Sequence, residues 1–185
     1  MLGIEIIIVV GILVILIIAA IIIYNQLVKY KNLMQEAWSG IDVFLKKRHD
    51  LVPNLVEIVK GYSAHEKTTL EDITRYRSEA MQAKDTGAQV VSENLLGKAL
   101  TNLFVTVENY PTLKANVNFL RLQQQLTDLE HDLEASRRYY NGTVRINNTY
   151  VEKFPSNIIA GIFNFRKGVF FAVDSSEKEV PQVIL

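Results

Sequence analysis

The side chains that could do chemistry include three histidines, because imidazoles bind metals and transfer protons. His49, His65 and His131 each stand next to a carboxylate in the sequence. Neighbours on a helix point about 100° apart, so such a pair does not readily share one metal ion. We interpret each pair as part of a solvated helix face. A metal site assembled from several helices stays open as an alternative.

Other catalytic motifs are missing from the sequence. It has no His-Glu-x-x-His pair, no Gly-rich phosphate loop and no nucleophile elbow. The 185 residues include no cysteine, which excludes disulfides and thiolate metal sites, and 20 basic residues are balanced by 20 acidic ones. Because no excess of basic charge is left to hold a nucleic-acid backbone, we expect no nucleic-acid partner. We also expect no cofactor and no enzymatic activity.

Arg48 is the most informative polar residue, because the spacing of its neighbours places it in an apolar helical seam. A guanidinium between helices needs a carboxylate and hydrogen bonds to offset its desolvation. In an antiparallel, end-aligned pair of long helices, Arg48 would lie near His131 and Asp132, with Glu130 also in reach. Such a pairing would specify helix register. The alternative is a side chain that extends from the seam into water.

The elements that position these residues are helices, because apolar residues recur at alternating intervals of three and four. One such seam runs from Met34 to Tyr62, and another runs from Phe119 to about residue 152. Shorter helices are predicted between them, over about 63–87 and 90–110. No strand-like alternation of useful length precedes residue 155, so the predicted fold is all-α. The simplest arrangement is an antiparallel bundle of two long helices and a shorter helical hairpin.

Pro53 lies inside the first seam. Its ring removes one backbone hydrogen bond and presses on the carbonyl of His49. Because the apolar spacing continues in register beyond it, we expect a kink at Pro53 and not the end of the helix.

The N-terminal segment is a predicted membrane anchor. From Ile6 to Tyr24 every side chain is apolar or glycine. At about 1.5 Å per residue this run spans about 28 Å, close to the hydrocarbon thickness of a bilayer. Because backbone groups in lipid must bond to one another, we predict a transmembrane helix that contacts the bilayer through residues 6–24. A cleavable signal peptide is the alternative, but the leader has no basic residues and the apolar core is long.

Charges beside the anchor predict its orientation. Lys29 and Lys31 follow the span, whereas Glu5 and the amino group precede it. The positive-inside rule then places the N-terminus outside and the bulk of the chain in the cytoplasm. The predicted organisation is a transmembrane anchor over 1–25, a cytoplasmic antiparallel helical bundle over 26–153, and a short amphipathic helix with a tail over 154–185.

Helix lengths predict an incompletely covered stalk next to the membrane. The long helices span about 54 Å each and the short ones about 30 Å, so the short pair can cover only the distal part of the bundle. Exposed apolar area of this kind usually marks an interface. The residues expected to be incompletely covered are Leu27, Leu33, Trp38, Tyr139, Tyr140, Val144, Tyr150 and Val151. We therefore predict a homo-oligomer, and the alternative is that the C-terminal segment folds back over the stalk.

The C-terminal segment changes character at Pro155, which ends the long helix. Ser156 and Asn157 can cap a short helix that begins there. Its apolar residues include Ile158, Ile162 and Phe163, and Arg166 and Lys167 follow. Apolar residues beside basic ones fit an interfacial helix close to the bilayer. Simple packing on the bundle is the equal alternative.

Short motifs spread in order along nearly the whole chain resemble the LemA family. They include Glu36-Ala37-Trp38-Ser39, Pro53-Asn54-Leu55-Val56-Glu57, Val59-Lys60-Gly61-Tyr62, Tyr110-Pro111, Ser136-Arg137-Arg138-Tyr139-Tyr140-Asn141 and Phe154-Pro155-Ser156-Asn157. The resemblance implies a bacterial protein with one N-terminal membrane helix and an antiparallel helical domain. It implies no enzymatic activity and no cofactor. Members of the family are associated with membrane proteases or with cell-envelope functions.

These observations favour a non-enzymatic, membrane-anchored scaffold that self-assembles at the bacterial membrane. The second function is a sensor or adaptor, in which bending at Pro53 relays a signal to a membrane-protein partner such as a protease or kinase. A hydrolase or metalloenzyme is the third and least favoured. The candidate interaction residues are Trp38, Ile41, Leu45, Arg48, Pro53, Tyr139, Tyr140, Tyr150, Ile158, Ile162 and Phe163.

Overall fold

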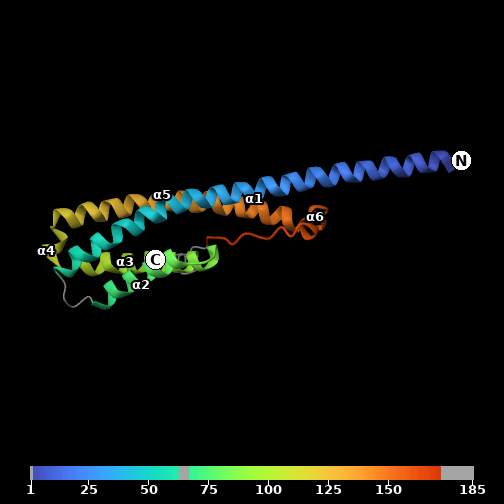
Figure 1. Ribbon diagram of the computed structural model, residues 1–185. Helices are drawn as coiled ribbons and strands as arrows, with labels where there is room; N and C mark the ends of the chain where they lie inside the picture. Colours follow the sequence, from blue (N-terminus) through green and yellow to red (C-terminus); the bar gives the residue numbers. More distant parts are fainter. Residues whose placement is uncertain (1, 63–66, 172–185) are drawn as a thin grey trace, which may run out of the picture. The chain divides into compact units, whose positions relative to one another are not determined.

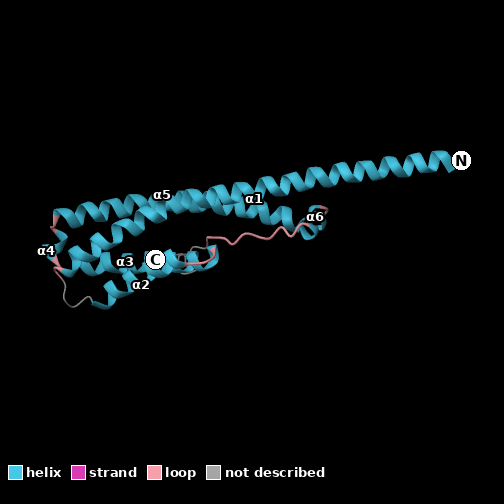
Figure 2. Cartoon of the chain, viewed as in Figure 1, coloured by secondary structure: helices cyan, strands magenta, loops and turns pink. Residues whose placement is uncertain are grey.

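A computed structural model describes residues 2–62 and 67–171, and the regular elements in these ranges are all helices (Figure 2). They are labelled in Figure 1 as α1 (Leu2–Lys60), α2 (Lys67–Gln82), α3 (Thr86–Val107), α4 (Pro111–Lys114), α5 (Val117–Glu152) and α6 (Ser156–Ile162). The predicted all-α fold is confirmed. A long apolar N-terminal helix continues without a break into a helical bundle.

The chain forms two compact units. The first unit contains Met1–Ser39 and Arg138–Phe170, and the second contains Gly40–Arg137 and Phe171–Leu185. Helices α1 and α5 therefore contribute residues to both units, whereas α2, α3 and α4 belong to the second and α6 to the first.

The core of the second unit forms on the seam that the sequence predicts. Val52, Leu55 and Val59 of α1 follow one another at intervals of three and four and are buried. They cluster with Leu70 and Ile73 of α2, Leu96, Leu100 and Leu103 of α3, and Phe119, Leu122 and Leu126 of α5. Burial of each such aliphatic side chain contributes about 1.5–3 kcal/mol, which is why tertiary packing, more than helix propensity, holds these helices.

Helix α3 begins earlier than the spacing of its apolar residues predicts. The Asp85 carboxylate accepts a hydrogen bond from the Ala88 amide at 2.9 Å and so caps the first turn. The helix therefore starts at Thr86 and not near residue 90, and Gly87 lies in its first turn instead of ending the preceding helix. The predicted start of that preceding helix, at residues 63–66, lies outside the described residues.

Aromatic rings pack α1 against α5 and the C-terminal segment within the first unit. The Tyr24 ring meets Phe163 and Phe165 edge-on, with centroids 4.7 and 5.7 Å away. Trp38 meets Tyr140 in the same way at 5.2 Å. Contacts of this type contribute about 0.5–1.5 kcal/mol each beyond the area they bury.

The segment that follows α6 is held on α5 by side-chain hydrogen bonds. The Asn148 amide donates to the Gly168 carbonyl at 3.0 Å and accepts from the Gly168 N–H at 2.7 Å. The Tyr140 hydroxyl donates to the Val169 carbonyl at 2.8 Å. Gly168 lets the segment lie close to α1, because a Cβ at this position would meet the Met34 sulfur and the Met34 side chain would have to move. The backbone of this segment is therefore hydrogen-bonded by side chains of α5.

This return of the C-terminal segment corrects the predicted stalk. Leu27, Tyr140 and Val144 are buried within the chain, whereas they were expected to be incompletely covered. Tyr139 remains exposed. The prediction considered only helices as possible cover for these side chains. The segment after α6, which has no regular structure, also packs on α5, as in the alternative stated for the C-terminal segment.

Candidate functional site

Arg48 of α1 is the centre of a buried charged cluster in the second unit. Its guanidinium donates to the Glu130 carboxylate at 3.0 Å and to the Glu93 backbone carbonyl at 3.3 Å, and it forms an ion pair with the Glu93 side chain. Arg48 is buried, so the alternative of a side chain that extends into water is wrong. The predicted partner Glu130 is confirmed. His131 and Asp132 are exposed instead, because Glu130 is the residue whose side chain reaches the seam.

Glu93 of α3 is the residue that sequence analysis missed. Its side chain has 0% exposure, and its second carboxylate oxygen lies 2.7 Å from His49 Nε2. The signal that points to it is its spacing, because 93, 96, 100, 103 and 107 alternate by three and four. Glu93 therefore occupies a seam position in α3, as Arg48 does in α1. Two oppositely charged residues at seam positions indicate a pair.

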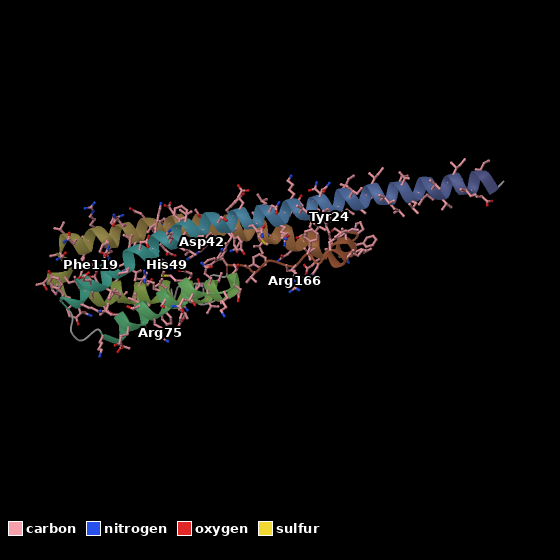
Figure 3. All side chains as sticks on the ribbon, viewed as in Figure 1. Tyr24, Asp42, His49, Arg75, Phe119 and Arg166 are labelled. Atoms are coloured by element: carbon pink, nitrogen blue, oxygen red, sulfur yellow. The ribbon has the colours of Figure 1, made fainter. Side chains whose placement is uncertain are left out.

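The sequence neighbours of His49 suggested that it belongs to a solvated helix face, and this interpretation is wrong. It is buried, and its ring faces Glu93 on α3 (Figure 3 labels His49). The adjacent Asp50 is exposed, so the apparent His-Asp pair in the sequence has no structural counterpart. The functional partner of His49 lies 44 positions away in the chain.

The electrostatics of the cluster favour an ionised Glu93. Burial alone would raise the pKa of this carboxyl, but the hydrogen bond with His49 and the charge of Arg48 outweigh burial and hold the pKa below its usual value. Glu130 connects the cluster to Arg137, whose guanidinium donates to it at 2.9 Å. Burial lowers the pKa of Arg137 and the charge of Glu130 opposes that change. The Arg137 guanidinium also lies 4.5 Å from the centre of the Phe171 ring.

Pro53 is connected to the same cluster through a backbone carbonyl. Proline has no N–H, so it cannot donate to the carbonyl of His49 four residues earlier. The structure supplies a replacement, because Arg77 Nε of α2 donates to this carbonyl at 2.7 Å. Helix α1 continues through Pro53, as predicted. Residues 48 and 49 therefore bind α2, α3 and α5 at once.

The two central charges of the cluster are enclosed by the protein. Arg48 and Glu93 are closed to solvent, so a substrate cannot reach the carboxylate. Among residues 2–62 and 67–171, no three histidines, cysteines or carboxylates are placed to hold a metal ion. Removing one partner of such a buried ion pair typically costs about 3–5 kcal/mol, because the other charge is left buried without compensation. The register role that its seam position suggests for Arg48 stays a prediction.

The remaining candidate interaction residues divide into buried and exposed groups. Ile41 and Leu45 are core residues, and Trp38 is half-buried against Tyr140. Tyr150 is half-buried, and its ring lies 4.3 Å from that of Tyr30. The exposed members are Pro53, Tyr139, Ile158, Ile162 and Phe163. These five are the candidate interaction residues that the chain leaves exposed.

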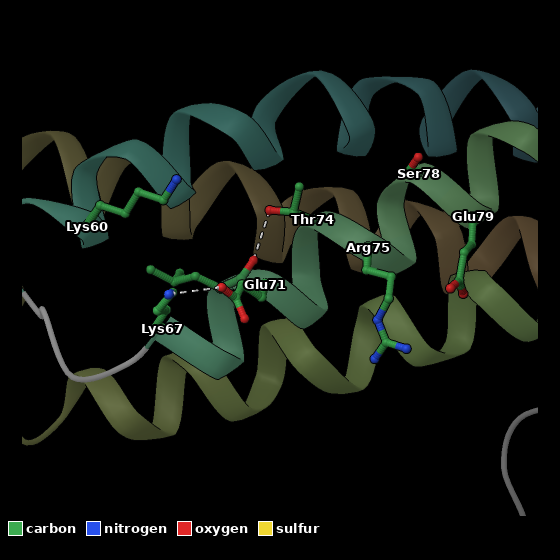
Figure 4. Close-up of a pocket in the computed structure, with 8 residues that line it drawn as sticks. Lys60, Lys67, Glu71, Thr74, Arg75, Ser78 and Glu79 are labelled. Atoms are coloured by element: carbon green, nitrogen blue, oxygen red, sulfur yellow. Dashed lines mark hydrogen bonds and ion pairs between the residues drawn. The ribbon is translucent and has the colours of Figure 1, made fainter.

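The second unit also has an open groove of 620 Å³ between the end of α1 and α2 (Figure 4). Its lining mixes basic and acidic side chains with Leu70. Lys67 lies 3.8 Å from Glu71, and Arg75 pairs with Asp72 at 2.5 Å. Two of its three cations, Lys67 and Arg75, are therefore already paired with carboxylates, and the charges of the lining do not define a binding site for a particular ligand.

Helix α1 is long and apolar enough to cross a membrane, by length and composition. It is the one helix of the described residues with this property, and no part of its most apolar stretch is buried among those residues.

Comparison with known proteins places this chain among membrane-associated helical proteins. The sequence profile of the LemA family matches residues 37–184. The magnetosome protein MamQ 2 of Paramagnetospirillum magneticum is 24% identical, over 80% of this chain and 64% of that protein. MamQ of Magnetospirillum gryphiswaldense is 23% identical with the same coverage, and Protein LemA of Metamycoplasma hominis is 26% identical over 83% of this chain and 71% of that protein. The chain therefore spans 64% of the length of the magnetosome relatives.

Proposed function

Because this chain belongs to the LemA family, we propose that it is a non-enzymatic, membrane-anchored helical scaffold. Residues 6–24 hold it in the bilayer, and copies of the chain associate with one another at the bacterial membrane. Its role would be organisation of the cell envelope. The closed charged cluster supports the non-enzymatic part of the proposal, since its one fully buried carboxylate serves Arg48 and His49.

The observation that carries self-association is an exposed apolar pair on α5 in the first unit. Tyr139 is 58% exposed and Ile146 is 41% exposed. They are seven residues apart and therefore share one face of the helix. Single exposed apolar residues are normal, but this pair belongs to the same compact unit as the anchor. An anchor confines all copies to one plane with one orientation, which raises their effective concentration.

The proposed orientation is single-pass, with the N-terminus outside and the rest of the chain in the cytoplasm. Lys29 and Lys31 follow the span closely and Glu5 precedes it. The positive-inside rule favours retention of the lysine side in the cytoplasm.

The experiment that tests the scaffold is a mass measurement on the full chain in nanodiscs and in mild detergent. We expect multimers for the native chain and a shift to smaller species for Tyr139→Ser with Ile146→Ser. A matched control is Val91→Ser with Val105→Ser on α3, which removes exposed apolar area from the second unit. A native chain that keeps its fold as a strict monomer would end the proposal.

A sensor or adaptor is the second candidate, and the bond from Arg77 to the His49 carbonyl favours it. This bond connects the proline position of α1 to another helix, so bending of α1 at Pro53 would change how α2 is held. Such a protein would pass the change to a membrane-protein partner such as a protease or kinase. Gently solubilised membranes should then yield a foreign subunit in fixed stoichiometry with this chain, whereas the scaffold yields mainly self-assemblies.

A further inference from the structure

We propose that α6, together with Phe154, is a second membrane contact that lies in the headgroup region of an anionic bilayer. This surface, called here the α6 surface, consists of Phe154, Ile158, Ile162 and Phe163. The inference rests on the membrane anchor of the proposed function and is independent of self-association.

The first observation is that α6 presents two of its three isoleucines away from the protein, whereas Ile159 is half-buried. Ser156 and Ala160 are buried, whereas Ile158 is 53% exposed and Ile162 is 69% exposed. At about 100° per residue, the two isoleucines lie about 200° around the helix from the two small residues. A helix on the surface of a water-soluble protein normally turns its apolar face toward the protein core. The reversed arrangement of α6 is expected where the outer surroundings are themselves apolar.

The second observation fixes the depth of α6 relative to the bilayer. Tyr24 is the last residue of the apolar run, and tyrosine prefers the membrane–water boundary. The centroids of the Phe163 and Phe165 rings lie 4.7 and 5.7 Å from the centroid of the Tyr24 ring. The end of α6 therefore lies at the level where the anchor leaves the hydrocarbon. Figure 3 labels Tyr24 and also Arg166, which follows these rings in the chain.

The third observation is that hydrogen bonds fix α6 to the end of α5. The Ser156 hydroxyl donates to the Tyr150 carbonyl at 2.6 Å or to the Lys153 carbonyl at 3.0 Å. After α6 the chain turns at Asn164, which has a φ of 56°, a left-handed conformation that asparagine tolerates. The Phe165 amide then donates to the Ala160 carbonyl at 2.9 Å. These bonds keep the isoleucines outward at a fixed height.

The fourth observation is the charge around the α6 surface. The described residues of the first unit that flank it carry an excess of basic over acidic side chains, and this excess complements anionic headgroups. The basic residues are Lys29, Lys31, Lys153, Arg166 and Lys167, against Glu152, which pairs with Lys167. Apolar side chains bordered by cations are the composition of helices that lie in an anionic interface.

The test uses the absence of cysteine from the native chain, which makes any introduced thiol unique. Ile158→Cys and Ile162→Cys are each spin-labelled in the full chain and placed in vesicles that contain anionic phosphatidylglycerol. Collision rates of the label with oxygen and with a water-soluble nickel chelate then report its depth. Asn157→Cys is the matched control, because Asn157 is an exposed polar residue of the same helix that points about 100° away from Ile158. Ile15→Cys reports the middle of the anchor.

We expect the labels at 158 and 162 to collide more with oxygen and less with the nickel chelate than the label at 157. Their depth in the bilayer should be smaller than that of the label at 15. Equal nickel collision at 157, 158 and 162 would overturn the proposal. Low collision with both reagents at 158 and 162 would also overturn it, because it indicates a protein partner or a second copy on this surface. If the label at 15 is also in water, the anchor itself has failed, and that result is distinguishable from failure at α6 alone.

The anionic part of the proposal has its own measurement. Arg166→Gln with Lys167→Gln should increase nickel collision at the 162 label in phosphatidylglycerol vesicles, and so should a change to purely zwitterionic lipid. Circular dichroism of each variant checks that helicity is retained. An unchanged depth in both experiments would show that headgroup charge is not recognised and would overturn that part.

Discussion

At the scale of single residues, Glu93 decides how the charged cluster behaves. Its carboxylate serves Arg48 through one oxygen and His49 through the other, and all of these groups are buried. Arg48 could be predicted as a buried cation because its seam position is visible in the sequence. Glu93 occupies an equivalent position in α3, but the buried apolar residues from Leu96 onward define that seam more clearly than a single carboxylate does. The His49 contact depends on tertiary packing and has no signal in the local sequence.

The first prediction concerns Glu93→Gln. This change should lower the free energy of unfolding by about 3 kcal/mol, the low end for breaking a buried ion pair, because Glu130 still compensates Arg48. Chemical denaturation in detergent, followed by circular dichroism, measures it. Glu57→Gln on the exposed side of α1 is the control and should change stability by less than about 0.5 kcal/mol. Equal stability of Glu93→Gln and the native chain would contradict the prediction.

The second prediction concerns pH and follows from the lowered pKa of Glu93 in the folded chain. A carboxyl whose folded pKa lies below its unfolded value stabilises the fold at neutral pH, and this stabilisation is lost as pH falls through the folded pKa. The difference in unfolding free energy between the native chain and Glu93→Gln should therefore be largest above the ordinary glutamate pKa of about 4.3 and shrink as the pH falls below it. Parallel denaturation curves across this range measure the difference. If this difference in unfolding free energy grows as the pH falls, the prediction is contradicted.

At the scale of elements, the sequence predicted the helices, whereas it offered the return of the last segment only as an alternative. The seams in α1 and α5 have regular three-four spacing over many turns, and that spacing depends only on local sequence. Residues 165–170 have no regular structure, and their partners Tyr140 and Asn148 lie in α5. No periodicity describes such a segment, because its hydrogen bonds go to side chains and not to a neighbouring strand.

The third prediction tests the bond that replaces the one lost at Pro53. Arg77→Met should destabilise the native chain by about 1–3 kcal/mol, because the His49 carbonyl loses its donor. In a Pro53→Ala background the helix supplies an N–H to this carbonyl, so the same substitution should cost about 1 kcal/mol less. A double-mutant cycle of unfolding free energies measures this coupling. Additive effects of the two substitutions would contradict it.

At the scale of the whole molecule, the strength of the anchor follows from its composition. Family membership and fold were predictable, because the motifs and the apolar run are continuous features of the sequence. The isoleucine, leucine and valine side chains between residues 6 and 24 favour insertion by about 5–9 kcal/mol, at about 0.3–0.6 each. A central lysine costs about 3 kcal/mol. One lysine is therefore too few to release the chain.

The fourth prediction follows from that comparison. Ile15→Lys should leave the chain in the membrane, whereas Ile12→Lys with Ile17→Lys, which costs about 6 kcal/mol, should release a large fraction. The fraction that remains with membranes after alkaline extraction measures the effect. Tyr139→Lys is the control, because this residue is exposed and lies outside the apolar run. Release by the single central lysine would show that the anchor is weaker than its composition indicates.

The hydrogen bond from Arg77 to the His49 carbonyl also has a consequence for local unfolding. When α2 detaches, this carbonyl loses the donor that Arg77 supplies, so part of the cost of detachment arises inside α1. Hydrogen exchange should then show the amides around residue 53 and those of α2 becoming unprotected with the same free energy, as one cooperative unit. The proline position of α1 and the docking of α2 open and close together.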